Sequence, residues 1–230
     1  MSTTIAPAAL RDRVAALLRD NRMVILAEFV IVALVRFEVL PFSPATIPLL
    51  LLGYLSLWLR QSGWREIGMG RPASWRRTIL LGTGIAVAWH ILDFAVVVPL
   101  LRRVTGESLD LSEFSSLRGN LPELLYWVSL SWMLAAFGEE MVYRGYILNR
   151  LADLFGRSRA GWALSLTIMG LLFGVGHIYL GTLGLVLNTV DGIVLGVLYL
   201  ASGRNLWLTV IQHGVANTIG FILIFLGFSP

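Results

Sequence analysis

Residues 182–201 read TLGLVLNTVDGIVLGVLYLA, a run in which Asp191 carries the only charge. A membrane-spanning helix needs about 20 mostly apolar residues, so this run is long enough to cross a bilayer. Because its apolar residues are continuous rather than alternating, a helix is favoured over a strand of a membrane barrel. The run therefore predicts a helical membrane protein.

The composition of the whole chain supports this class. Of 230 residues, 57% are hydrophobic and 14% are charged, whereas an average soluble domain has about 25% charged residues. The chain has no cysteine, which excludes a disulfide scaffold and any thiolate nucleophile or metal ligand. We expect the lipid bilayer as a partner and no nucleic acid, since nothing resembles a basic aromatic nucleic-acid face.

Seven segments are apolar enough to be candidate membrane helices. They predict an all-α, polytopic transmembrane bundle of about seven or eight helices, with eight if the long fourth segment is broken. Glycines are expected to let these helices approach closely. The segments are 23–40, 45–59, 78–101, 123–151, 162–178, 182–201 and 205–227, and the glycines are Gly82, Gly84, Gly170, Gly174, Gly176, Gly192 and Gly196.

The arginines indicate how the bundle is oriented. Four lie before residue 23, and others gather in the loops 60–77 and 150–159 and at Arg204. Short loops rich in Lys and Arg face the cytoplasm. We therefore expect a multi-pass plasma-membrane protein with a cytoplasmic N-terminus, and an active-site cavity that opens toward the cytoplasmic half.

The densest polar cluster in an apolar segment is GEEMVYR at 138–144. A charged residue at bilayer depth costs at least about 2.5–3.5 kcal/mol, so the cluster requires a reason. Glu140 and Arg144 are four residues apart and can pair on one helix face. Glu139 points about 100° away, and a free carboxylate in an apolar cavity suits a general acid or base. The structural alternative is a salt bridge near the membrane interface.

Two histidine motifs follow, FGVGH at 173–177 and HGVAN at 213–217. His213 and Asn217 are again four residues apart and share a helix face. Glycines lie beside both histidines, and their lack of a side chain is expected to leave room for a water molecule or a substrate backbone. The glycines concerned are Gly174, Gly176 and Gly214. The alternative is a hydrogen-bonded core histidine and interhelical hydrogen bonding.

The three motifs EExxxR, FxxxH and HxxxN, in this order, resemble the CPBP family of membrane proteases. That family includes CAAX prenyl protease 2, the bacterial Abi proteins and lysostaphin-resistance-type proteins. The resemblance covers roughly residues 120–220. We expect one integrated membrane domain, made of a cytoplasmic arm (1–22), N-terminal transmembrane helices (23–121) and a catalytic membrane core (122–230). The matching residues are Glu139, Glu140, Arg144, Phe173, His177, His213 and Asn217.

The resemblance implies an intramembrane endopeptidase for membrane-associated peptides, such as prenylated CAAX-type or leader-peptide substrates. It assigns water activation to Glu139 and His177, and oxyanion stabilisation to His213 and Asn217. The supporting positions are Glu140, Arg144 and Phe173. No cofactor is favoured, but His177, His213 and Glu139 also form a set that binds zinc in catalytic sites. The chain has no HExxH pair on one helix.

Rival functions depend on other polar residues of the apolar segments. Asp191 is a second-tier candidate for the cavity wall, and His90 with Asp93 is expected to form a structural pair, with a proton relay as the alternative. In a proton- or ion-coupled transporter, these groups would line the path. The absence of repeated halves disfavours a transporter. A non-catalytic membrane scaffold or immunity protein is the other alternative.

The first apolar segment, 23–40, also contains three charged residues. Glu28 is expected to cap a neighbouring helix or to face a lateral opening. Arg36 and Glu38 are expected to reach the membrane interface with their charged ends. None of the three is predicted to take part in the active site.

Overall fold

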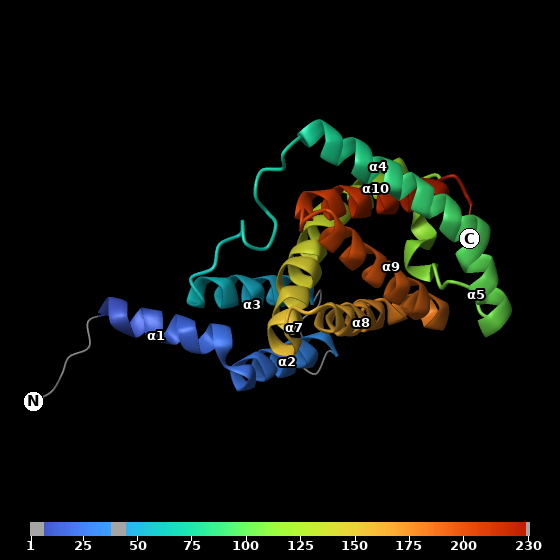
Figure 1. The fold of residues 1–230 in the computed structure, drawn as a ribbon. Helices are drawn as coiled ribbons and strands as arrows, with labels where there is room; N and C mark the ends of the chain where they lie inside the picture. The colour runs from blue at the N-terminus through green and yellow to red at the C-terminus, as the bar shows by residue number, and fades with distance from the viewer. Residues whose placement is uncertain (1–6, 38–44, 229–230) are drawn as a thin grey trace, which may run out of the picture.

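The computed structural model describes residues 7–37 and 45–228, and all regular secondary structure within these ranges is helical (Figure 1). The predicted all-α class is confirmed. The α-helices are α1 (Pro7–Asp20), α2 (Arg22–Arg36), α3 (Thr46–Leu59), α4 (Trp75–Leu92), α5 (Val98–Thr105), α6 (Leu121–Leu130), α7 (Leu148–Phe155), α8 (Arg159–Val175), α9 (Gly181–Ala201) and α10 (Leu206–Phe225). The π-helical segments are η1 (Asp93–Val97), η3 (Ser131–Glu139) and η4 (Met141–Ile147), and the 3₁₀ segments are η2 (Ser112–Leu117) and η5 (Ile178–Leu180).

Local sequence explains where several helices start and stop. The side chains of Ser74, Asn120 and Ser158 each accept a hydrogen bond from a backbone N–H in the first turn of α4, α6 and α8. These caps satisfy donors that have no partner inside the helix. At the end of α5, Gly106 adopts φ 73°, a left-handed conformation that favours glycine.

Three helices of the described residues are long and apolar enough to cross a membrane: Trp75–Thr105, Ile178–Ala201 and Leu206–Phe225. The apolar helices Thr46–Leu59 and Arg159–Val175 are shorter. A helix occupies most of the described part of each predicted segment. The predicted total of seven or eight crossings is not confirmed.

The long fourth segment is one helix from α6 through η3 and η4 to α7, without the break that an eighth crossing requires. Its middle is π-helical, and Glu139 ends the first π segment. π-Helical turns are rare and frequently mark functional sites. The wider turns change the direction in which the polar cluster projects.

Glycines bring the helices of the carboxyl-terminal half together. A Cβ atom built on Gly192 would lie 3.1 Å from Cα of Gly170, where α9 crosses α8. A Cβ on Gly82 would lie 2.9 Å from Cγ2 of Ile211, where α4 packs on α10. Close approach is therefore confirmed at these positions, whereas Gly84 faces open space. Small residues are the usual means by which membrane helices approach each other.

Glu28 and Arg150 form a partly buried ion pair that the sequence did not predict. Arg150 donates from Nη2 to Oε1 of Glu28 at 2.7 Å, and its side chain is 1% exposed. Glu28 also accepts from Ser56 and Tyr146. The expected helix cap or lateral opening at Glu28 is therefore wrong. The placement of Arg150 in an exposed loop is also wrong, because it lies on α7 and joins α7 to α2.

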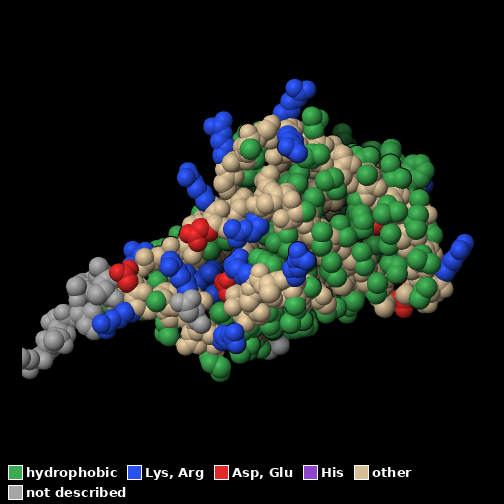
Figure 2. All heavy atoms as spheres, viewed as in Figure 1, with side chains coloured by type: hydrophobic (Ala, Val, Ile, Leu, Met, Phe, Trp, Pro, Cys, Tyr) green, Lys and Arg blue, Asp and Glu red, His purple; other side chains and the backbone are tan. Residues whose placement is uncertain are grey.

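Basic side chains gather at one end of the molecule, over α1 and the loop between α3 and α4 (Figure 2). Much of the rest of this face is apolar. We name this end of the molecule the arginine-rich end. Exposed arginines of that loop and of the start of α4 are Arg65, Arg71, Arg76 and Arg77.

Candidate active site

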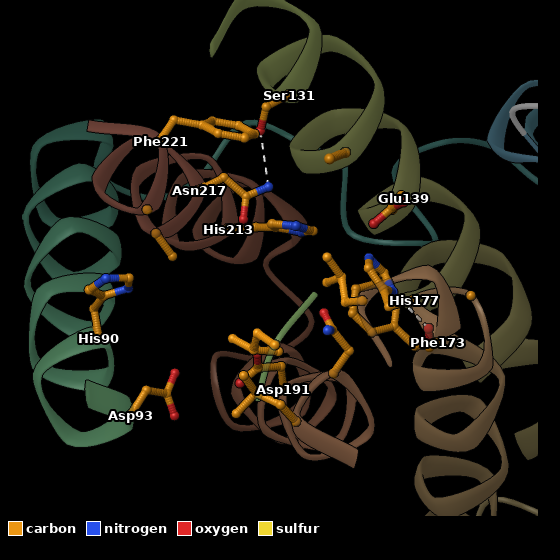
Figure 3. A pocket seen from close by; sticks show the side chains of 18 of the residues that line it. His90, Asp93, Ser131, Glu139, Phe173, His177, Asp191, His213, Asn217 and Phe221 are labelled. Carbon is orange, nitrogen blue, oxygen red and sulfur yellow. Dashed lines mark hydrogen bonds between the residues drawn. The ribbon is translucent and has the colours of Figure 1, made fainter. Parts of the chain in front are cut away.

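A cavity of about 730 Å³ lies between α4, α9, α10 and the helix that runs from Leu121 to Phe155. Figure 3 shows side chains of Glu139, His177 and His213 pointing into the same space from three different elements. Asn217 lines the same cavity from α10, one turn beyond His213. The folded chain thus brings together the four residues that were expected to form the site.

His177 lies at a break in the chain rather than deep within a helix. α8 ends at Val175, and the 3₁₀ turn η5 begins at Ile178. His177 thus occupies the connection between α8 and η5. The ring Nδ1 lies 2.9 Å from the carbonyl oxygen of Phe173. Because a carbonyl can only accept, Nδ1 carries the proton and Nε2 keeps a free lone pair in the neutral ring.

His213 is held by a buried charge cluster. Its Nδ1 lies 2.9 Å from Oε1 of Glu140, and Nη1 of Arg144 lies 2.7 Å from the same oxygen. The Glu140 and Arg144 side chains are both 0% exposed. The Glu140–Arg144 pair was predicted from their spacing, and it is present. The contact with His213 was not predicted, since the two residues are 73 positions apart.

Phe173 packs at the centre of this cluster. Its ring stacks edge-on against Tyr143, with centroids 5.0 Å apart, and lies 4.7 Å from the His177 ring. The Arg144 guanidinium lies 4.7 Å from the centroid of the same ring. Phe173 therefore contacts both His177 and the buried cation.

Asn217 is oriented by Ser131, a residue that no sequence motif singled out. The Asn217 side-chain nitrogen donates to Oγ of Ser131 at 3.0 Å, as Figure 3 shows. The two residues lie on α10 and at the start of η3, 86 positions apart. No local pattern pointed to Ser131, because its role depends on how these two helices pack.

The opposite wall of the cavity carries Asp191, His90 and Asp93. Asp191 lines the cavity as expected, and its Oδ1 accepts from the Trp89 indole at 2.7 Å. The expected pair of His90 and Asp93 is wrong, because no hydrogen bond or ion pair joins them. Nε2 of His90 and Oδ1 of Asp93 are buried without a hydrogen-bond partner.

The cavity lies away from the arginine-rich end. Its lining includes Leu109, Leu111 and Phe114, next to η2, but no residue of the loops 60–77 or 150–159. The span Trp75–Thr105 separates these two groups of residues. The expectation that the cavity opens toward the arginine-rich half is therefore wrong.

Two expectations, about the glycines and about Arg36, need correction. The space beside Gly174, Gly176 and Gly214 is filled by Thr189, Arg36 and Trp132, respectively. These glycines therefore admit protein side chains rather than water or substrate. Arg36 lines the cavity instead of reaching the interface, and Glu38 lies outside the described residues.

Among residues 7–37 and 45–228, no three His, Asp or Glu side chains are grouped so that they could bind a metal ion together. The possible zinc set of His177, His213 and Glu139 is therefore not assembled as a ligand group. His213 uses Nδ1 to contact Glu140, and His177 uses Nδ1 to contact a backbone carbonyl.

Residues 121–219 match the family model described as Rce1-like, type II CAAX prenyl endopeptidase. The match covers 99 of the 230 residues, so this segment is similar to that family. It spans the helix from α6 to α7, α8, α9 and most of α10, and so includes Glu139, His177, His213 and Asn217. This similarity supports a CAAX-type intramembrane protease in general, and a membrane-associated peptide as the class of substrate. Neither the search of curated proteins nor the search of solved structures found a match.

Proposed function

We propose that the protein is an intramembrane endopeptidase that hydrolyses peptide bonds of membrane-associated substrates. The observation that carries the proposal is the convergence of Glu139, His177, His213 and Asn217 on one cavity of about 730 Å³. Buried ionisable groups in a membrane bundle are costly and are usually functional. Peptide hydrolysis needs a base for water, donors for the oxyanion and a proton for the leaving amine.

Glu139 and His177 are proposed to activate the water. Oε2 of Glu139 is buried and has no hydrogen-bond partner, so this carboxylate is free to accept a proton. The bond from Nδ1 of His177 to Phe173 leaves Nε2 as the acceptor for the same water. After attack on the peptide carbonyl, the proton passes from these groups to the leaving amine, and water adds as OH and H to the two products.

His213 and Asn217 are proposed to stabilise the oxyanion. This role requires the doubly protonated ring, in which Nδ1–H donates to a carboxylate and Nε2–H is free to donate to the oxyanion. Glu140 provides that carboxylate for His213, and Ser131 holds the Asn217 amide. Loss of one preorganised oxyanion donor typically slows a reaction by about 10²–10³.

We further propose that the reaction proceeds without a metal ion. The four cavity residues supply the base, the acid and the oxyanion donors. Incubation of the purified protein with EDTA, followed by removal of the chelator, should leave the cleavage rate unchanged. A loss of activity that zinc restores would contradict this mechanism and favour the His177, His213 and Glu139 ligand set.

The arginine-rich end is proposed to face the cytoplasm, which is the usual side for basic loops. The cavity then opens toward the outer half of the plasma membrane. Its apolar wall residues, including Leu134, Leu187 and Val194, suit a lipid-anchored or transmembrane peptide. A prenylated CAAX-type peptide and a leader peptide are the two substrates proposed.

The function is tested by comparing membranes that contain the wild type with membranes that contain Glu139→Ala. Terminal peptides are mapped by mass spectrometry in both, and each candidate peptide is then incubated with pure protein in proteoliposomes. The proposal expects peptides that appear only with the wild type and that the pure wild type cleaves. Absence of any such peptide would overturn it.

Proton transport is the second candidate, because His90 and Asp93 carry unpartnered polar atoms on the wall opposite Glu139. Proton flux into the same proteoliposomes distinguishes the two functions. A peptidase gives no flux above that of empty vesicles. Flux that Asp93→Asn removes would favour the transporter.

A further inference from the structure

Arg36 reaches the proposed catalytic cavity from outside the segment 121–219 that matches the family model. It is the last residue of α2, and it lines the cavity together with Tyr143, Gly176 and His177. Its guanidinium lies directly over Gly176, where a Cβ atom would overlap Nη2 and Cζ and would lie 2.7 Å from Nε of Arg36. The absence of a side chain at Gly176 is therefore what lets the guanidinium approach His177.

The guanidinium has no anionic partner within the described part of the chain. Its Nε is buried without a hydrogen-bond partner, and no carboxylate of residues 7–37 or 45–228 lies within ion-pair distance. Arg36 is also the one arginine among the described residues that line the cavity. Arg36 is half-buried, and a buried N–H donor without a partner is costly. An unpaired cation at the cavity wall therefore points to an anion that the protein itself does not provide.

The planar guanidinium presents paired N–H donors that match a carboxylate, which makes arginine the preferred residue for binding one. We propose that Arg36 binds a carboxylate of the substrate peptide and determines specificity for it. This inference rests on the proposed peptidase function. The carboxylate comes either from the C-terminus of the peptide or from an Asp or Glu side chain near the cleaved bond.

The probe is a peptide whose cleavage separates the wild type from Glu139→Ala, synthesised in three forms. One keeps its free C-terminal carboxylate, one ends in an amide, and one has its acidic side chains replaced by Asn or Gln. Binding of each form is measured by fluorescence anisotropy in the Glu139→Gln background, so that no turnover occurs. KM and kcat are measured with Glu139 intact.

With Arg36 present, removing the recognised carboxylate should weaken binding and raise KM about 10- to 100-fold, as expected for a charge-assisted contact. Arg36→Gln should weaken binding of the intact peptide by a similar factor and remove the difference between the forms. Arg36→Lys, which keeps a positive charge, should restore part of the difference in binding between the peptide forms. Weaker binding of the amidated peptide would identify the C-terminus as the recognised carboxylate. Weaker binding of the Asn- or Gln-substituted peptide would identify an acidic side chain.

Gly176→Ala provides a second variant. It keeps Arg36 in the chain, but the added Cβ displaces its guanidinium. It should reduce the discrimination between the peptide forms in the same direction as Arg36→Gln. Arg118→Gln, an exposed arginine that does not line the cavity, should leave discrimination unchanged.

Equal binding of all three forms by a protein that cleaves them would overturn the role of Arg36 while leaving the peptidase function intact. A shift in the pH profile of kcat by Arg36→Gln that is equal for all three peptides would also overturn it, because Arg36 would then act on Glu139. Failure of the wild type to cleave any peptide would instead count against the proposed function.

Discussion

Nδ1 of His213 lies 2.9 Å from Oε1 of Glu140, and this oxygen is the one that Arg144 contacts at 2.7 Å. The three residues come from two helices, and Nη2 of Arg144 also donates to the backbone oxygen of Gly192 on α9. One buried carboxylate thus balances the charge of Arg144 and orients the ring of His213. Stability and activity should therefore depend on the same residue.

Glu140→Gln should lower both the stability and the activity of the protein. Removing one charge of a buried pair leaves Arg144 uncompensated, at a cost of about 3–5 kcal/mol in the free energy of unfolding. His213 loses the carboxylate that orients its ring, so kcat should fall by about 10²–10³ in the fraction that remains folded. Unfolding in detergent and turnover in proteoliposomes measure the two effects.

The matched control is Glu66→Gln, which changes an exposed glutamate at the arginine-rich end and should alter stability by less than about 0.5 kcal/mol. If Glu140→Gln were as stable and as active as this control, the buried cluster would have no role.

Glu28→Gln should separate stability from catalysis. Glu28 accepts hydrogen bonds from Ser56, Tyr146 and Arg150, but it does not line the cavity. Loss of its charge should destabilise the fold by about 1–3 kcal/mol and leave kcat of the folded protein unchanged. A large fall in kcat without a change in stability would show that this pair acts on the active site.

Gly170→Leu should disrupt the crossing of α8 and α9. A Cβ at position 170 already meets Cγ1 of Ile193 at 2.5 Å, and overpacking of this kind costs about 1–3 kcal/mol. Gly84→Leu is the control, since nothing lies within 4 Å of a Cβ there. Thermal unfolding in detergent compares the two. Equal midpoints would mean that the close approach at Gly170 contributes nothing to stability.

The proposed orientation is testable because the chain contains no cysteine. Ala73→Cys lies at the arginine-rich end, and Ser115→Cys lies beyond the span Trp75–Thr105, next to the cavity. A membrane-impermeant maleimide should label Ser115→Cys on intact cells, and Ala73→Cys only after lysis. The reverse pattern would place the cavity on the cytoplasmic side.

The sequence predicted what short-range geometry determines. The spacing of Glu140 and Arg144 was sufficient for their ion pair, and long apolar runs were sufficient for the helical class. In each case, the interacting residues lie within a few turns of one another.

Contacts between distant segments were not predictable in this way. Ser131 and Asn217 meet only because η3 and α10 pack together. Arg36 was assigned to the interface because arginines at helix ends usually extend to water. The end of α2 instead lies against Gly176, where the missing side chain leaves space for the guanidinium.

The side on which the cavity lies was misjudged for a related reason. The expected position of the cavity depended on the nearest arginines, including Arg150. Arg150 is in fact buried against Glu28, so it does not mark the membrane surface.

The most direct test of the central claim is the turnover rate of Glu139→Gln, measured on a peptide that the wild type cleaves in proteoliposomes. Glu107→Gln, an exposed glutamate outside the cavity, serves as the control. Loss of a general base typically slows a reaction by about 10²–10⁴, and we expect a decrease of this size with an unchanged unfolding midpoint. Turnover of Glu139→Gln equal to that of the control would contradict the assignment of Glu139 as the base that activates water.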